Sequence, residues 1–555
     1  MSAVSPSRQA AFHILMAVER GQSHSDDLLR GKAVNALSPP DRNLATTLVL
    51  GVLRWQIRLD HQLRALLTRP NAKLDPEILV ALRLGAFQLL HLDRIPARAA
   101  IDESVELAKQ SGHRFASRMV NAVLRKLAQS SGSKDRPLAL KEQGSGPAEN
   151  AANSTGALLH AEKQGFVSGH DFSRAASDAK STRAVQAAEK LAALKGHDFS
   201  RAASASKSTW PLGPTESFSP DSPADLPFSA ASLAPKEMSP EELSLTHAHP
   251  AWLVERWVAF YGLEAARGLC RHGQTQPVPS VRIESSAAEA ELSQAGVELV
   301  PGELLTAART VLSGDVTATA AFREGRIRLQ DEGSQLIAEI AGQGSAAHTI
   351  LDCCAAPGGK TLILAERNPQ VRIVACESSP QRLAGLRKRL AAYAAQVECR
   401  LADAAALEES SAFDVVLADV PCSGTGTLGR NPEIRHRLRP ADLPRQAERQ
   451  RAILRAALRA VRPGGRVVYS TCSLEPEENE QVVAAALAEF PNARPIPLHS
   501  QIESLLAAGI LTASGAQRLH GCLTPEGALR LLPGVFHTDG FFIALIERTT
   551  GDAGS

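Results

Sequence analysis

The 555-residue sequence lacks any long hydrophobic run. A helix that crosses a bilayer needs about 20 mostly apolar residues, and no run of even about 18 occurs, so we expect no membrane span. The short stretch AFHILMAV near the start is flanked by Arg8, Glu19 and Arg20 and lacks a small-residue cleavage site, which indicates a helix rather than a secretory signal. These absences predict a cytoplasmic protein.

Closely paired cysteines are absent too. The eight cysteines lie between Cys270 and Cys522, without a C-x-x-C pair and without a histidine cluster at metal spacing. A disulfide framework or a structural zinc site would need such spacing, so we expect reduced thiols and no metal.

Aromatic residues are few, at 4%, and the net charge is only +2. The small net charge hides an uneven distribution, because residues 1–130 carry 18 Lys and Arg against 11 Asp and Glu. A basic unit joined to a faintly acidic remainder favours an anionic partner for the N-terminal part, although a solvated helix surface explains the charge as well.

The hydrophobic pattern divides the chain into four predicted regions. Residues 1–130 repeat apolar residues at helical spacing and predict an all-α domain, whereas 131–246 is rich in Ser and Ala, duplicates GHDFSRAAS and predicts a disordered insert. Residues 247–345 predict a small α+β subdomain. In 346–549 strand-length apolar runs alternate with helical stretches, which predicts an α/β, doubly wound Rossmann-like domain that ends in an antiparallel hairpin.

A glycine-rich turn, LDCCAAPGGKT, follows the first predicted strand of the α/β domain. Gly358 and Gly359 would let a cofactor approach the backbone at a helix N-terminus. A phosphate-binding Walker loop would need glycine where Cys354 stands, so we do not expect an NTPase. The next two predicted strands end at Glu377 and Asp403, which are placed to bind a ribose and an adenine amino group and so favour an adenosine-containing cofactor.

Two cysteine motifs follow the fourth and fifth predicted strands: DVPCSGTG with Cys422, and YSTCSLEPEENE with Cys472. The carboxyl ends of such strands form the edge where doubly wound sheets bind ligands. A lone buried cysteine usually acts as a small apolar residue, but two at corresponding strand ends indicate chemistry.

These motifs, together with DGFF near the C-terminus, resemble in order and spacing those of the Sun-type RNA cytosine-5 methyltransferases, over about 249–549. The stretches DRNLATTLVLGVLRWQIRLD, RIPARAAIDESVELAK and VNAVLRK resemble the NusB-like RNA-binding domain that one branch carries. The combination is similar to the RsmB (Sun/Fmu) family, whose members methylate cytosine 967 of 16S ribosomal RNA. The sequence departs from the family pattern at the insert, which should be peripheral, and at Val420, where the family usually has Ala.

The resemblance implies a role for individual residues. Cys472 is expected to be the nucleophile, Cys422 the thiol that assists product release, and Asp419 the group at N3 of the cytosine, with Lys360 in contact with Asp419 or the base. The implied cofactor is S-adenosyl-L-methionine. The residues expected to bind it are Cys354, Ala355, Ala356, Pro357, Gly358, Gly359, Lys360, Glu377, Asp403 and Asp419.

The chemistry explains why two thiols are useful. Carbon 5 of cytosine is a poor nucleophile, and addition of a thiolate to carbon 6 turns the ring into an enamine that can take a methyl group. An acid at N3 helps the addition, and a base then removes the proton from carbon 5. Spacing alone does not tell which cysteine attacks, but the attacking thiol is expected to have the lower pKa.

Arginine density favours an RNA partner, because eleven arginines lie between Arg430 and Arg466. The resemblance implies that this RNA is 16S ribosomal RNA, and we expect a monomeric enzyme. Arg430, Arg435, Arg437 and Arg439 follow the fourth predicted strand, where they could hold phosphates or a flipped-out base. Methylation of another RNA or of DNA, and an inactive RNA-binding or antitermination factor, stay open as alternatives. The basic helical domain disfavours DNA, and retention of both thiols and Asp419 disfavours an inactive factor.

Overall fold

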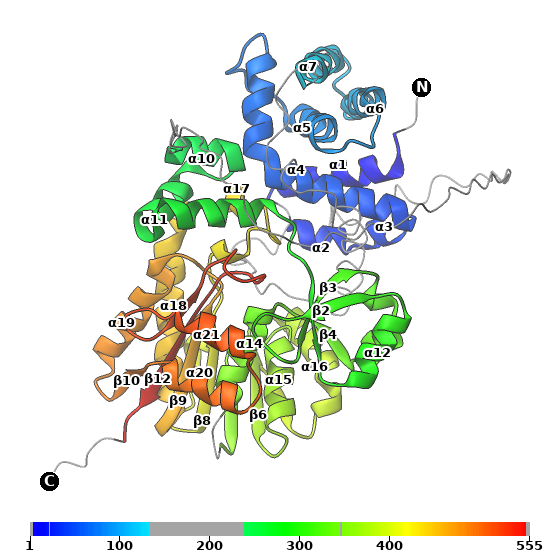
Figure 1. Ribbon diagram of the computed structural model, residues 1–555. Coiled ribbons are helices and arrows are strands. Elements are labelled where there is room, and N and C mark those ends of the chain that lie inside the picture. Colours follow the sequence, from blue (N-terminus) through cyan, green and yellow to red (C-terminus); the bar gives the residue numbers. More distant parts are fainter. Residues whose placement is uncertain (1–3, 22, 132–237, 344–346, 551–555) are drawn as a thin grey trace, which may run out of the picture. The chain divides into compact units, whose positions relative to one another are not determined.

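The computed structural model describes residues 4–21, 23–131, 238–343 and 347–550 (Figure 1). Nearly all of the predicted insert, 131–246, therefore lies outside the described residues. Among the helices in the described ranges, none combines the length and the apolar character needed to cross a membrane.

The described N-terminal residues up to 131 are helical, as predicted. Helix α4 begins after Ser38, whose hydroxyl accepts a hydrogen bond from the Asp41 N–H at 3.3 Å and so caps the helix. Leu48, Leu82 and Leu124, from three of the helices, lie fully buried in one core. The helices are α1 (Pro6–Glu19), α2 (Ser25–Leu29), α3 (Lys32–Asn35), α4 (Pro39–Leu66), α5 (Pro76–His91), α6 (Ala97–Gln110) and α7 (Ala116–Ser131).

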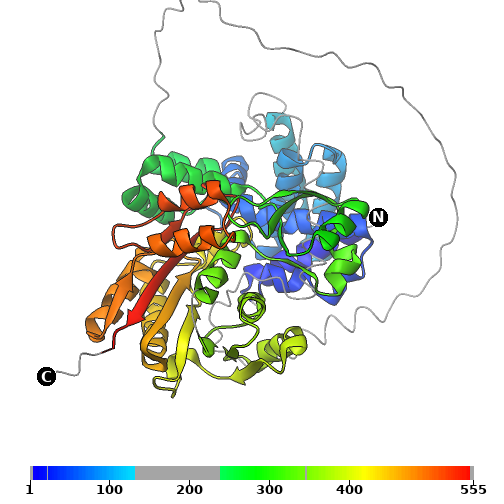
Figure 2. The same cartoon turned by 60° about the horizontal axis from the view of Figure 1, so that its bottom comes forward.

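Two further helices precede the first strand, α10 (Pro240–His247) and α11 (Ala251–Gln274). Helix α10 lies inside the range that we expected to be an insert, so folded chain resumes before the predicted boundary at 246. The reason is local, because Ser239 and Glu242 form a reciprocal capping box and Leu243 is fully buried. Helices α10 and α11 pack on each other and both contact α4 (Figures 1 and 2).

The small α+β subdomain contains a four-stranded antiparallel sheet in the order β2-β3-β1-β4. Arg282 of β1 is fully buried and pairs with Glu339 of α14 at 2.6 Å, which joins this sheet to a helix that also packs against the larger sheet. The elements are β1 (Ser280–Ile283), α12 (Ser286–Gln294), β2 (Glu298–Pro301), β3 (Ala308–Ser313), α13 (Ala320–Arg323), β4 (Ile327–Leu329) and α14 (Glu332–Gly342).

The larger sheet has the strand order β10-β12-β9-β8-β5-β6-β7, with β11 paired to β12. Strands β5 to β9 run parallel, and β10, β11 and β12 form antiparallel pairs. The parallel sheet and the antiparallel pair at the C-terminus were both predicted. The strands are β5 (Thr349–Asp352), β6 (Arg372–Glu377), β7 (Val397–Leu401), β8 (Phe413–Asp419), β9 (Val461–Thr471), β10 (Ala493–Ile496), β11 (Leu529–Leu531) and β12 (Phe541–Arg548).

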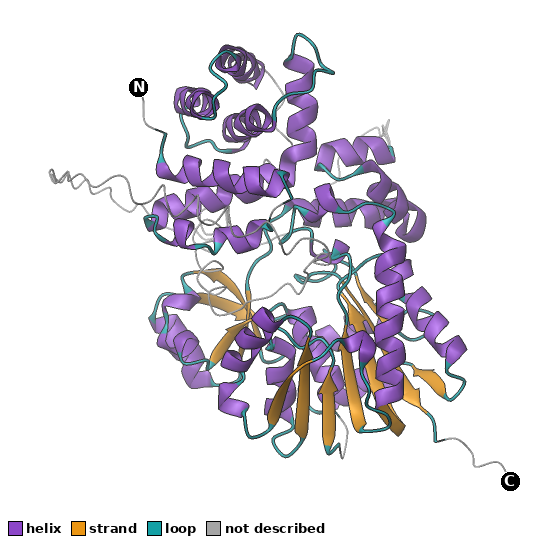
Figure 3. Cartoon of the chain, turned by 180° about the vertical axis from the view of Figure 1, so that it is seen from behind, coloured by secondary structure: helices purple, strands orange, loops and turns teal. Residues whose placement is uncertain are grey.

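Helices cover both faces of this sheet, as a doubly wound fold requires (Figure 3). Neighbouring residues of β8 point to opposite faces, so Leu417 packs in the core under one helical layer and Val416 in the core under the other. The first layer contains α14, α15 (Gly359–Arg367), α16 (Pro380–Arg389), α20 (His499–Ala507) and α21 (Ala513–His520). The second contains α18 (Asp442–Ala460) and α19 (Glu480–Glu489).

Candidate active site

A pocket opens at the carboxyl ends of the parallel strands, where the strand order reverses. Strands β5 and β8 are neighbours, and the chain continues from β5 to β6 and β7 on one side and from β8 to β9 on the other. Ligands of doubly wound sheets bind at this reversal. The pocket encloses about 510 Å³ of empty space, including its open mouth. Its lining residues are Cys353, Cys354, Ala356, Glu377, Ser378, Arg382, Ala402, Asp403, Ala404, Asp419, Pro421, Arg449 and Ile453.

The glycine-rich turn between β5 and α15 forms one wall of the pocket, through Cys354 and Ala356. Gly358 has φ +104°, a left-handed backbone conformation that residues with a side chain rarely adopt, and this conformation is why glycine is needed there. Five other residues that we expected to bind the cofactor do not line the pocket, and instead form the turn or the first residues of α15: Ala355, Pro357, Gly358, Gly359 and Lys360.

The two predicted strand-end acids, Glu377 and Asp403, both line the pocket. Glu377 is buried, and its Oε1 accepts hydrogen bonds from the Ser379 N–H at 2.7 Å and from Arg382 Nη2 at 2.8 Å. Asp403 is exposed and accepts from the Ala405 N–H at 3.0 Å, which holds the turn after β7. Two acids from successive strand ends therefore face one pocket, the arrangement that suits the hydroxyl and amino donors of an adenosine group.

Sequence reasoning missed Asp352, which ends β5 beside this pocket. Burial raises the pKa of the Asp352 carboxyl to about 7, and the charge of Asp419 acts in the same direction. The hydroxyl of Thr361 donates to Asp352 Oδ2 at 2.7 Å, which favours the charged form. Its position at a strand end, like those of Glu377 and Asp403, was the signal that could have identified it.

Lys360 and Asp419 meet, as the resemblance implied. Lys360 Nζ lies 2.8 Å from Asp419 Oδ2, and the hydroxyl of Ser470 donates to Asp419 Oδ1 at 2.7 Å. The lysine comes from the start of α15, the acid from the end of β8 and the serine from β9. Three adjacent elements therefore fix one carboxylate at the edge of the pocket.

The two cysteines also meet, because Cys422 follows β8 and Cys472 follows β9 on adjacent parallel strands. Their sulfur atoms are 3.7 Å apart, and both residues are buried. Burial raises the pKa of the Cys472 thiol well above its ordinary value, and Cys422, Asp419 and Asp539 act in the same direction. This is opposite to the lowered pKa that we expected for an attacking thiol, since burial and nearby acids both disfavour the thiolate.

Arg430 lies inside the protein, although we expected it to face RNA. Its guanidinium donates to Asp539 Oδ2 at 2.8 Å and to Asp331 Oδ2 at 3.1 Å. Burial lowers the pKa of Arg430, but the two aspartates outweigh burial and leave that pKa above its ordinary value. Asp331 also caps α14 through the Gly333 N–H at 2.9 Å, so Arg430 joins the loop after β8 to α14 and to the DGFF motif.

Arg435 and Arg437 also make contacts within the chain. Arg435 is buried and donates to the backbone carbonyls of Arg54 at 3.0 Å and Ala248 at 3.3 Å, and also to those of Gly273 and Leu428. Burial lowers the pKa of Arg435 to about 9. Arg437 contacts the backbone carbonyl of Ser23 and His24 Nδ1. The side chain of Arg439 is exposed, so of the four predicted RNA-binding arginines it is the one on the open surface.

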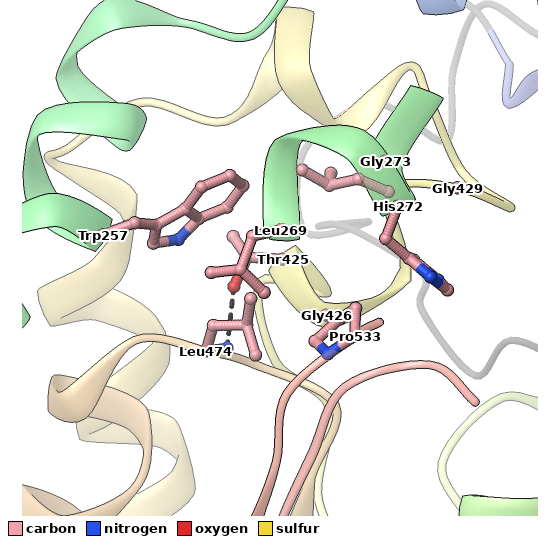
Figure 4. A pocket seen from close by; sticks show the side chains of 10 residues that line it. Trp257, Leu269, His272, Gly273, Thr425, Gly426, Gly429, Leu474 and Pro533 are labelled. Carbon is pink, nitrogen blue, oxygen red and sulfur yellow. Dashed lines mark hydrogen bonds between the residues drawn. The ribbon is translucent and has the colours of Figure 1, made fainter. Parts of the chain in front are cut away.

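A second, smaller pocket lies behind the cysteine loops, with about 190 Å³ of empty space (Figure 4). Trp257 and Leu269 of α11 line one side of this pocket, and Leu474 lines the other. The Leu474 N–H donates to Thr425 Oγ1 at 2.8 Å, which ties the loop after Cys472 to the loop after Cys422. Trp257 Nε1 also donates to Glu475 at 3.3 Å, so α11 supports the loop that follows Cys472.

Comparisons with known proteins agree with this architecture. The family model of the 16S rRNA methyltransferase RsmB/F matches residues 343–547, and that of the NusB family matches residues 5–129. A Bacillus subtilis protein described as a probable ribosomal RNA small subunit methyltransferase B is 28% identical, over 98% of each chain. The ribosomal RNA small subunit methyltransferase B of Klebsiella pneumoniae is 32% identical, over 54% of this chain and 67% of its own. The crystal structure of PH0851 has the same fold, with a TM-score of 0.64, 21% identity, and coverage of 98% of this chain and 99% of its own.

Proposed function

The chain belongs to the RsmB/F family of 16S rRNA methyltransferases, and from that membership we propose that it methylates carbon 5 of a cytosine in 16S ribosomal RNA, of the cytosine 967 type. The observation that carries the proposal is the pair of thiols, Cys422 and Cys472, 3.7 Å apart at adjacent strand ends beside the pocket. Two thiols are what a covalent addition and a later elimination at cytosine require.

The cofactor is S-adenosyl-L-methionine, which supplies an electrophilic methyl group when it is bound. The pocket fits it, because acids stand at the ends of two successive strands and Cys354 and Ala356 of the glycine-rich turn line the same space. We propose that Glu377 binds the ribose hydroxyls and that Asp403 accepts from the adenine amino group. Ser378, Arg382 and Arg449 also line the pocket and would contact the same molecule.

We propose that Cys472 attacks carbon 6 of the cytosine. The carbon–sulfur bond forms as the carbon 5–carbon 6 double bond opens, and carbon 5 can then accept the methyl group. Asp419 stands at N3 of the base, and the ammonium group of Lys360, 2.8 Å from Asp419, is the proton source that balances charge there. Cys422, in its thiolate form, takes the proton from carbon 5. Cys472 then leaves as a thiolate, which restores the double bond, and N3 returns its proton to Lys360, which frees the enzyme.

We propose that the basic helical domain, residues 1–130, and the exposed Arg439 hold the RNA. Phosphates attract clustered Lys and Arg without regard to base sequence, so these groups would position the RNA and the pocket would select the base. Arg435 and Arg437 contribute indirectly, because their hydrogen bonds join the loop after β8 to the helical domain.

The test is to map 5-methylcytosine by mass spectrometry in 16S ribosomal RNA from cells with this protein, without it, and with the Cys472→Ala variant. We expect one cytosine to lose its methyl group in the deletion strain and to stay unmodified with the variant. Loss at no cytosine would overturn the proposal. Recovery of the modification in DNA rather than RNA would favour the DNA alternative.

A further inference from the structure

A buried carboxylate lies directly beneath both thiol-bearing loops. Glu478 ends the 3₁₀ turn Pro476–Glu478 after β9, and its exposed fraction is 0%. Its Oε1 accepts hydrogen bonds from the Ser423 N–H at 2.8 Å and from Gln450 Nε2 at 2.9 Å. Its Oε2 accepts from the hydroxyls of Ser423 and Ser473. Four donors from three elements therefore converge on one side chain.

Each of the two serines is the chain neighbour of one thiol. Ser423 directly follows Cys422, and Ser473 directly follows Cys472. Their hydroxyl oxygens are 3.0 Å apart, so Glu478 Oε2 closes a compact junction between the two loops. Because a serine and its preceding cysteine share a peptide unit, fixing the serines also restricts the two sulfur atoms.

We propose that Glu478 is a positioning residue for the two-thiol reaction, which holds Cys422 and Cys472 at the separation that addition and elimination need. The inference rests on the proposed function and deepens it. Gln450 on α18 extends the junction, because its Nε2 also donates to the Pro421 carbonyl at 3.0 Å, one residue before Cys422. The carboxylate touches neither pocket, so its effect is on geometry rather than on binding of the cofactor.

The charge of Glu478 matters to this junction. Burial is the main reason that the pKa of the Glu478 carboxyl is raised to about 7; Cys422 acts in the same direction, and the hydrogen bonds from Ser423, Ser473 and Gln450 act against it. Tyr469 of β9 is a further titratable group packed against it, and its hydroxyl donates to the Glu478 backbone carbonyl at 2.6 Å. When the Glu478 carboxyl is protonated, its own hydrogen occupies a position to which one of the four donors now points. All four hydrogen bonds therefore form above this pKa, and the junction weakens as the pH falls through it.

The variant that tests the inference is Glu478→Gln, since it keeps the shape and replaces one acceptor oxygen by an NH₂ group. We expect kcat to fall by about tenfold to a hundredfold, the cost of misplacing reacting groups by a fraction of an ångström to about 1 Å. Calorimetry should show an unchanged Kd for S-adenosyl-L-methionine. The rate of the wild-type enzyme should fall as the pH drops through about 7, and in Glu478→Gln this fall should become shallower because only Asp352 still titrates there. A merely structural role of Glu478 would not change the pH dependence.

Glu477→Gln is the matched control, because Glu477 is the preceding residue and pairs instead with Arg256. Glu477→Gln should keep the wild-type kcat and pH dependence. Glu478→Asp keeps the charge, so its rate should again fall as the pH drops through about 7, as in the wild type. Unchanged kcat in Glu478→Gln, or a lower kcat with an unchanged pH dependence, would overturn the inference. If Glu478→Gln does not fold, Ser473→Ala decides, since a normal kcat in that variant would also overturn it. A wild-type enzyme that methylates no RNA would instead defeat the proposed function.

Discussion

The surroundings of the Cys472 thiol disfavour its charged form. Burial, Asp419 and Asp539 raise the pKa of Cys472, and only a thiolate attacks carbon 6 efficiently. Attack by Cys472 therefore needs its proton to be removed when the RNA enters. Alkylation of the free enzyme is then a poor guide to which cysteine is the nucleophile, and a covalent complex with RNA is the better one.

We expect Cys472→Ala to be inactive and to form no covalent complex with RNA. Cys422→Ala should still attack and transfer the methyl group, and then stall, because no group removes the carbon 5 proton. A denaturing gel checks both, since the stalled complex is a band that RNase shrinks and that accumulates only with S-adenosyl-L-methionine.

The buried Cys376, on β6 and outside the pair, is the matched control, and Cys376→Ala should behave as the wild type. Trapping by Cys472→Ala but not by Cys422→Ala would reverse the two roles. Activity in both variants without trapping would show that this enzyme does not use two thiols.

Glu377→Ala should weaken the binding of S-adenosyl-L-methionine by about 1.5 to 3 kcal/mol, the value of a hydrogen bond to a charged group. Its carboxylate is buried in the pocket wall, and its loss also frees Arg382 from the ion pair at 2.8 Å. Isothermal calorimetry measures the change. Glu398→Ala on the neighbouring strand is the control, because it removes an exposed carboxylate and should leave the affinity unchanged. An unchanged affinity in Glu377→Ala would show that Glu377 does not bind the ribose.

At the scale of elements, the partners of the arginines in the loop after β8 could not be predicted from the sequence. The sequence pattern around an arginine beside a strand end is the same whether its guanidinium binds a phosphate or a backbone carbonyl. The partners of Arg435 include the carbonyl of Arg54, 381 residues away, which no local pattern reveals. The strand ends themselves were predictable, because each lies in an apolar run of characteristic length.

This difference gives a paired prediction. Arg435→Ala should lower the free energy of unfolding by about 3 kcal/mol, because it leaves several buried carbonyls without a donor. Arg439→Ala should leave that free energy unchanged and reduce the salt dependence of RNA binding by about one phosphate contact. Thermal unfolding and RNA titrations at several salt concentrations measure the two effects. Equal stability of both variants would show that the junction at Arg435 contributes little.

For the whole molecule, the order of domains could be predicted, but the residue at which folded chain resumes after the predicted insert could not be placed exactly. Periodicity predicted the helical domain and the parallel sheet, because both bury long, regular apolar faces. The eight-residue helix α10 is too short for periodicity, and only the Ser239–Glu242 box marked its start. The junction at Glu478 was equally hidden, since a glutamate in a polar motif does not show that it will be buried.

The segment between α7 and α10 gives the last prediction. It lies outside the described residues, and its composition, rich in Ser and Ala with scattered Pro, offers little apolar surface to bury. Replacing residues 135–235 by a flexible Gly/Ser linker keeps the Ser239 cap and should leave kcat within about a few-fold, because every site contact described above lies elsewhere. Methyl-transfer kinetics and calorimetry on both proteins measure the effect. A lost activity, or a cooperative unfolding transition that disappears with the segment, would show that it folds and takes part in the reaction.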